Sequence, residues 1–157
     1  MTRRLKVFLP ILGALLLLLS IFLAGRLFWR ETGATAMEVT RLPPTACDLN
    51  QMACRVELPG GGDLTAELTP RPLMPLQPLT ARLILRDVPA ESALLAFSGV
   101  NMDMPFDPVP LRETAPGQFI GQTALPICVT GPMRWRAEFS VMYRHRQIVA
   151  EFLFDSQ

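Results

Sequence analysis

One uncharged apolar segment near the N-terminus limits, more than any other feature, what this chain can become. Residues 7–25 read VFLPILGALLLLLSIFLAG and contain no charged side chain. About 20 apolar residues in a helix match the roughly 30 Å hydrocarbon layer of a membrane. The Leu, Ile and Phe side chains favour insertion and outweigh Ser20, Gly13 and Pro10. We therefore expect residues 7–25 to form one transmembrane helix in a lipid bilayer.

The charges that flank this segment predict its orientation. The basic residues, which are more numerous before the segment than after it, are Arg3, Arg4, Lys6, Arg26 and Arg30. Positive charge favours the cytoplasmic side, so we expect residues 1–6 inside and the rest of the chain outside. This predicts a single-pass protein of a bacterial inner membrane, with its C-terminal domain in the periplasm.

A cleaved signal peptide is the alternative for the same segment, because it also begins with basic residues and an apolar run. The run is longer than the apolar core of an ordinary signal peptide. The small-x-small sequence Ala34-Thr35-Ala36, which resembles a cleavage site, lies well beyond its end. In either case the C-terminal domain is exported.

The exported part has the composition and patterning of an all-β domain. Fifteen prolines disfavour long helices, and a net charge of +1 gives no reason to expect nucleic-acid binding. Residues 26–46 read as a linker, and residues 47–157 as the domain. Short runs are separated there by turn signals such as Gly60-Gly61-Gly62, which predicts about seven or eight antiparallel strands in a β-sandwich or barrel. The predicted strands are 54–58, 64–69, 79–86, 92–98, 118–125, 133–141 and 148–154.

Three cysteines lie in the part that we expect to be exported, where thiols tend to pair. Cys47 and Cys54 would close a short loop and stabilise the domain by roughly 2.5 kcal/mol, which leaves Cys128 unpaired. The alternative pairs Cys54 with Cys128 across the sandwich and leaves Cys47 free. Spacing alone does not separate these two connectivities, and we take the short loop as the prediction.

Two methionines form a possible soft metal site. Met102 and Met104 are two residues apart, so their side chains share a side if the segment is extended. A thiolate such as Cys128, or a further thioether from Met133 or Met52, would complete a three-coordinate set that suits Cu(I). Methionine is also a flexible core filler and the chain has eight, so simple packing is the alternative.

Enzymatic activity is not expected. His145, the only histidine, lies between Arg144 and Arg146 in a predicted turn, where a solvated side chain is the simplest reading. One histidine supports neither a histidine-based zinc site nor a catalytic triad, and no phosphate-binding glycine loop is present. Cys47 and Cys54 do not form a Cys-x-x-Cys pair, which leaves thiol–disulfide exchange as a weaker hypothesis.

Three segments in order resemble the exported domains of the FixH and YtkA-like families. They are Asn101-Met102-Asp103-Met104, the PGQFIG segment 116–121 and the LPICVTGPMRW segment 125–135. In those families a Met-containing segment precedes a G-x-[YF] strand, and a Gly-x-Trp pattern opens the next strand. This chain departs from the pattern in having Gly131-Pro132-Met133-Arg134-Trp135 and three cysteines. The resemblance implies an immunoglobulin-like β-sandwich, tethered to a membrane and linked to copper handling and cytochrome oxidase assembly.

These observations lead to two hypotheses about function. In the first, the chain is a non-enzymatic, membrane-anchored periplasmic domain that binds or delivers Cu(I) through Met102, Met104 and Cys128. Its partner would be a membrane oxidase or a copper-transport complex. In the second, the domain is a structural or interaction module of a membrane complex, and the same side chains pack or are bridged without metal.

Overall fold

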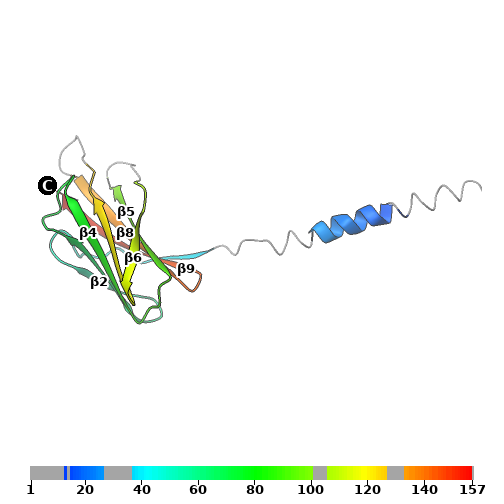
Figure 1. The fold of residues 1–157 in the computed structure, drawn as a ribbon, viewed down its shortest axis with the longest axis horizontal. Coiled ribbons are helices and arrows are strands. Elements are labelled where there is room, and N and C mark those ends of the chain that lie inside the picture. Colours follow the sequence, from blue (N-terminus) through cyan, green and yellow to red (C-terminus); the bar gives the residue numbers. More distant parts are fainter. Residues whose placement is uncertain (1–12, 14, 27–36, 101–105, 127–132, 157) are drawn as a thin grey trace, which may run out of the picture. The chain divides into compact units, whose positions relative to one another are not determined.

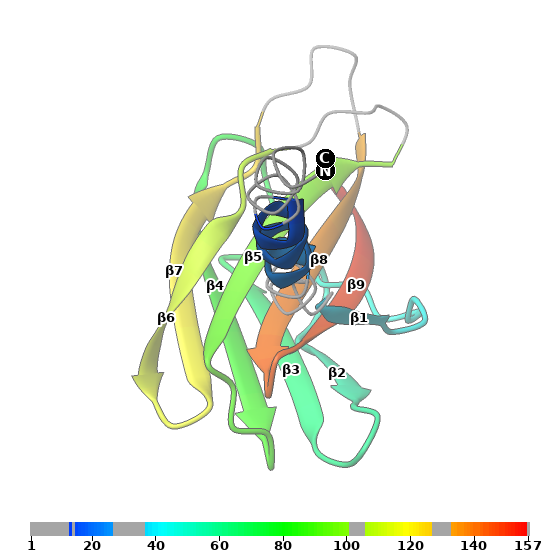
Figure 2. The same ribbon diagram turned by 90° about the vertical axis from the view of Figure 1, so that its right-hand side faces the viewer.

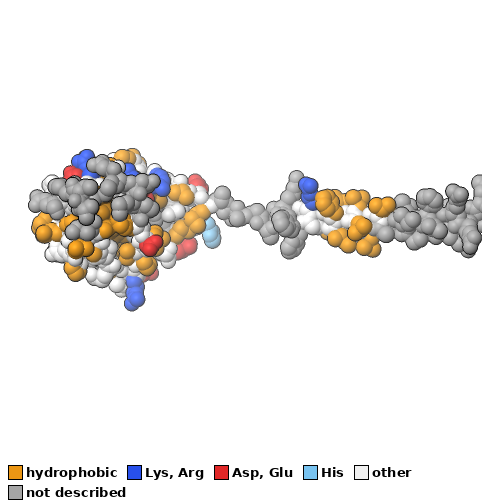
Figure 3. All heavy atoms as spheres, turned by 90° about the horizontal axis from the view of Figure 1, so that it is seen from above, with side chains coloured by type: hydrophobic (Ala, Val, Ile, Leu, Met, Phe, Trp, Pro, Cys, Tyr) orange, Lys and Arg blue, Asp and Glu red, His pale blue; other side chains and the backbone are white. Residues whose placement is uncertain are grey.

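The computed structural model describes residues 13, 15–26, 37–100, 106–126 and 133–156. The chain divides into two compact units, Met1–Ala36 and Met37–Gln157, and each is described by itself. In the first unit, residues 13 and 15–26 are helical. Apolar side chains cover the face of this helix that Figure 3 shows, and those of Leu15 to Leu19 are 54 to 64% exposed.

The predicted transmembrane segment, residues 7–25, lies partly outside the described residues. Within the described part of the chain, no helix combines the length and the apolar character needed to cross a membrane.

The second unit is built from β-strands, as the patterning predicted (Figures 1 and 2). Their bounds are β1 Glu38–Arg41, β2 Cys54–Glu57, β3 Asp63–Thr69, β4 Pro78–Arg86, β5 Ser92–Gly99, β6 Val109–Ala115, β7 Gln118–Ala124, β8 Met133–Tyr143 and β9 Arg146–Ser156. The all-β prediction is confirmed for this unit.

Within the described residues, the nine strands form one sheet that curls on itself, in the order β1-β9-β8-β5-β6-β7-β4-β3-β2. Strand β6 pairs with β5 on one side and with β7 on the other, so it connects the two halves of a sandwich-like body. One half contains β1, β9, β8 and β5, and the other contains β7, β4, β3 and β2. Figure 2 shows the two halves facing each other.

The core lies between the halves because the strands alternate buried and exposed side chains. Strand β8 is the clearest case, since every second residue from Met133 to Val141 is buried. Trp135 is 1% exposed, which confirms its expected place in the core. The rings of Phe139 and Phe152 meet edge to face with centroids 6.0 Å apart, a favourable arrangement for aromatic pairs.

Two strands were not predicted, β1 and β6. Strand β1 lies in the segment that was expected to be a linker, so the compact unit begins at Met37 rather than at Cys47. It pairs with β9 in parallel, in the register Glu38↔Arg146 to Arg41↔Val149. The expectation of a purely antiparallel sheet was therefore wrong at this edge. Strand β1 lies at the edge of the sheet and none of its side chains is buried, so its sequence lacks the alternation that marks a half-buried strand.

The segment between β1 and β2 connects the two halves. A disulfide joins Cys47 of this segment to Cys54, the first residue of β2, which confirms the predicted short loop. Leu49 is fully buried. The Asn50 side chain donates to the Asp155 carbonyl of β9 at 2.9 Å and accepts from the Leu73 amide at 2.7 Å. Asn50 thereby links β9 to the connection between β3 and β4.

Candidate functional site

The predicted copper ligands Met102, Met104 and Cys128 lie outside the described residues. The two alternative thioether ligands, Met133 and Met52, are among the described residues and differ in how far they are exposed. Met133 is buried at 6% exposure, whereas Met52 is 59% exposed. Among the described residues, no group of three or more His, Cys, Asp or Glu side chains is placed to hold a metal ion.

The described residues that flank segment 101–105 lie beside the start of β8, at one end of the domain, which we call the loop end and define by Val100, Phe106 and Met133. The Val100 amide donates to the Arg134 carbonyl at 2.9 Å. Gly99 pairs with Trp135, and the Phe106 ring lies 5.9 Å from the Trp135 ring between centroids. Val100 and Phe106, the described residues on either side of segment 101–105, therefore both lie beside the start of β8.

The same region carries paired charges on the outer face of the sheet. Asp155 accepts two hydrogen bonds from the Arg134 guanidinium, at 3.1 and 3.2 Å, and these bonds raise the pKa of Arg134. Arg136 donates to Glu151 at 2.7 Å. Both pairs join β8 to β9 across the strands, so these arginines belong to a solvated face of the sheet.

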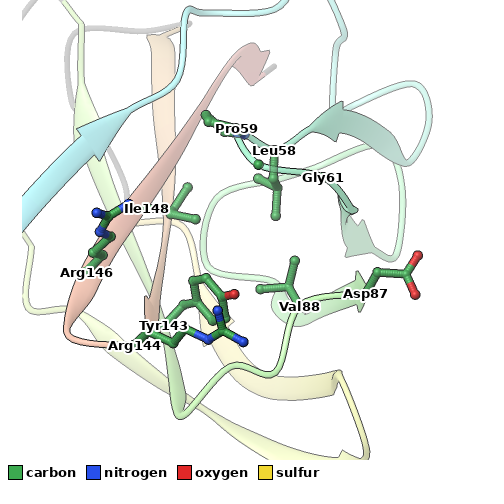
Figure 4. Close-up of a pocket in the computed structure, with 10 residues that line it drawn as sticks. Leu58, Pro59, Gly61, Asp87, Val88, Tyr143, Arg144, Arg146 and Ile148 are labelled. Carbon is green, nitrogen blue, oxygen red and sulfur yellow. The ribbon is translucent and has the colours of Figure 1, made fainter.

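A pocket of about 460 Å³ lies at the opposite end of β8 (Figure 4). We call it the turn pocket. Three connections line it: residues 58–61 between β2 and β3, residues 87–88 between β4 and β5, and residues 143–148 around the turn from β8 to β9. Its volume lies within the range of ordinary small-molecule sites, which is about 300–1,000 Å³.

The turn pocket has an apolar floor and a polar rim. Leu58, Val88 and Ile148 supply aliphatic side chains that are 6, 8 and 7% exposed. The rim holds the half-buried Tyr143 and the exposed Arg144. The Arg144 guanidinium lies over the Tyr143 ring, 5.1 Å from its centroid, as in a cation–π contact.

Unusual backbone conformations surround this pocket. Gly60 and Gly61 have φ of 94° and 101°, which glycine adopts without steric cost. Asp87, Arg144 and His145 have φ of 60°, 46° and 63°, in the left-handed region that side chains other than glycine rarely occupy. Such residues gather at functional sites in many proteins.

Sequence reasoning identified the turn at residues 143–146 but not the pocket beside it. The exposed His145 agrees with the expected solvated side chain. The residue types in the turn could have drawn attention to this site, because a two-residue hairpin turn of this kind normally uses Asn-Gly. Here Arg144 and His145 occupy those positions.

Comparison of the chain with family models, with curated proteins and with solved structures finds no match in any of the three. The resemblance to the FixH and YtkA-like families therefore stays a prediction.

Proposed function

We propose that this chain is a membrane-anchored, exported immunoglobulin-like domain that binds Cu(I) at its loop end as an accessory of a membrane complex. On the family resemblance, the partner is a membrane oxidase or a copper-transport complex. The observation that carries the copper proposal is that Val100 and Phe106, which flank segment 101–105, lie beside the start of β8, the strand that follows segment 127–132 in the chain.

Strand order supports the immunoglobulin-like assignment. Strands β3, β4 and β7 follow one another in one half, and β6, β5, β8 and β9 follow in the other. This is the arrangement of strands A, B and E facing C′, C, F and G in such sandwiches. On this assignment β1 and β2 are additions at the two edges.

Two observations support the membrane anchor and export. The apolar side chains around the helix are more than half exposed, and a helix that is apolar on all sides is usually covered by protein or lipid. The Cys47–Cys54 disulfide fits an oxidising compartment, because such bonds are rare where thiols are kept reduced.

Covalent continuity supports the choice of ligands. Segment 101–105, with Met102 and Met104, is held between Val100 and Phe106, and segment 127–132, with Cys128, precedes Met133. Val100, Phe106 and Met133 belong to the loop end, so both candidate segments are joined to the chain there, and together they contain three soft sulfur donors. Thioether and thiolate ligands favour Cu(I) over harder ions.

Titration of the full chain with Cu(I), in competition with a chromogenic Cu(I) chelator, tests the proposal. We expect one equivalent to bind and M102A/M104A to lose stoichiometric binding, because two of the soft donors are removed. Met74→Ala is the matched control, since Met74 is 48% exposed and lies in the connection between β3 and β4. Absence of stoichiometric binding, or equal binding by M102A/M104A, would contradict the copper role.

A metal-free interaction module is the second candidate, and the turn pocket favours it because this concave site at the opposite end of β8 from the loop end offers a binding surface without a metal. Capture of membrane partners by the M102A/M104A chain would support this function. Loss of partners in that variant, with partners retained by Met74→Ala, would favour the copper role.

A further inference from the structure

We propose that the turn pocket binds a small carboxylate with a compact branched apolar group, held by Arg144 and Tyr143 above the aliphatic floor. This goes beyond the copper proposal, because the pocket and the loop end lie at opposite ends of β8, a strand of 11 residues. A failure of copper binding would leave this inference untouched.

The backbone at Arg144 supplies the first argument. Tyr143 pairs with Arg146, so Arg144 and His145 form a two-residue turn in which both residues have positive φ. Asn-Gly adopts this turn with little strain, whereas Arg and His do not. The turn thus keeps a guanidinium at a strained backbone position. A role of this side chain in binding a ligand would explain why the strain is retained.

The charges around the pocket supply the second argument. Arg146 forms an ion pair with Glu38 at 3.0 Å, so its charge is already matched. Arg144 makes no ion pair with any residue that the structure describes, and its guanidinium lies over the Tyr143 ring. Figure 4 shows the Asp87 carboxylate directed away from Arg144. One unmatched positive charge therefore remains at the rim.

The chemistry of the lining defines the ligand. A guanidinium donates two parallel hydrogen bonds to a carboxylate, and the adjacent tyrosine hydroxyl is able to donate a third. Leu58, Val88 and Ile148 offer apolar surface below this pair and no charge, which suits an aliphatic group. A free branched-chain acid and the C-terminal leucine of a polypeptide share this chemistry.

Chemical-shift titration of the ¹⁵N-labelled full chain in nonionic micelles tests the inference, with the Gly60, Gly61 and Val88 amides as local reporters. The probes are 4-methylpentanoate and N-acetylglycyl-leucine, each paired with its neutral amide. We expect at least one acid to shift these amides and its amide to bind about tenfold more weakly or worse. The acid that binds identifies the source, free acid or polypeptide terminus.

Variants of the turn separate binding from folding. R144N/H145G installs a relaxed turn, so it should fold at least as stably while binding falls about tenfold or more. His145→Gly alone keeps the guanidinium and should retain binding. The inference is overturned if neither acid shifts the reporter amides, if acid and amide bind equally, or if R144N/H145G binds as well as His145→Gly.

Discussion

Asp63 is a buried carboxylate whose charge is matched by a single arginine. Its side chain accepts from Arg55 at 2.8 Å, and its second oxygen has no hydrogen-bond partner among the described residues. Arg55→Ala should lower the free energy of unfolding by about 1–2 kcal/mol, because it leaves a buried acceptor unmatched while the arginine itself is largely exposed. Urea denaturation measures this loss. Adding Asp63→Asn should restore part of it, and an unchanged midpoint for Arg55→Ala would contradict the argument.

The indole N–H of Trp135 has one buried hydroxyl as its hydrogen-bond acceptor. Its Nε1 donates to Ser156 Oγ at 3.0 Å, and Ser156 is 4% exposed. Ser156→Ala should cost about 1–2 kcal/mol of stability, because the indole N–H stays buried without an acceptor. Tryptophan fluorescence during urea unfolding gives the measurement. Ser140→Ala, a half-buried serine of β8, is the control and should cost less. Equal losses from the two variants would show that the indole bond adds no stability.

At the level of single residues, alternation predicted which side chains face the core but not which backbone conformations are strained. The inward place of Trp135 follows from its position in a period-two run, because a strand directs alternate side chains to opposite faces. The positive φ of Arg144 follows from a tertiary constraint, the pairing of Tyr143 with Arg146 in a two-residue turn. That constraint is invisible until both strands are placed.

At the level of elements, the Cys47–Cys54 disulfide ties the segment between β1 and β2 to the start of β2. Removing it in C47A/C54A should lower the free energy of unfolding by about 2.5 kcal/mol, since the closed loop no longer restricts the unfolded chain. Denaturation with and without reductant measures the effect. Reductant should destabilise the natural chain and leave C47A/C54A unchanged. Equal stability of the natural chain in both conditions would be inconsistent with a stabilising bond.

The two unpredicted strands share a physical cause. Leu111 is the one buried residue of strand β6, so the strand lacks the alternation that marks a half-buried strand, and Pro110 is a residue that disfavours strands. Strand β1 has no buried residue. Both are held chiefly by backbone pairing with neighbouring strands, which side-chain patterning does not encode.

For the whole molecule, the fold class could be predicted from the sequence better than the location of a binding site. The all-β unit follows from many short runs that agree with one another, whereas the turn pocket is assembled from three connections distant in sequence. No local pattern marks such a site, because its lining residues become neighbours only when the sheet curls. The proposed copper ligands come from sequence alone, and their test is the Cu(I) titration.

Export of the second unit is the prediction that concerns the entire chain. Alkaline phosphatase fused behind Gln157 should be active in a bacterial host, because that enzyme forms its disulfides only outside the cytoplasm. R3Q/R4Q/K6Q should lower this activity, since it removes the positive charge that holds the N-terminus inside, whereas R26Q/R30Q should maintain it. Activity normalised to the amount of fusion protein gives the comparison. An inactive phosphatase fusion, together with a fluorescent fusion to a protein that folds only in the cytoplasm, would place the unit in the cytoplasm. Thiols are kept reduced there, so this result would contradict both the Cys47–Cys54 bond and periplasmic copper binding.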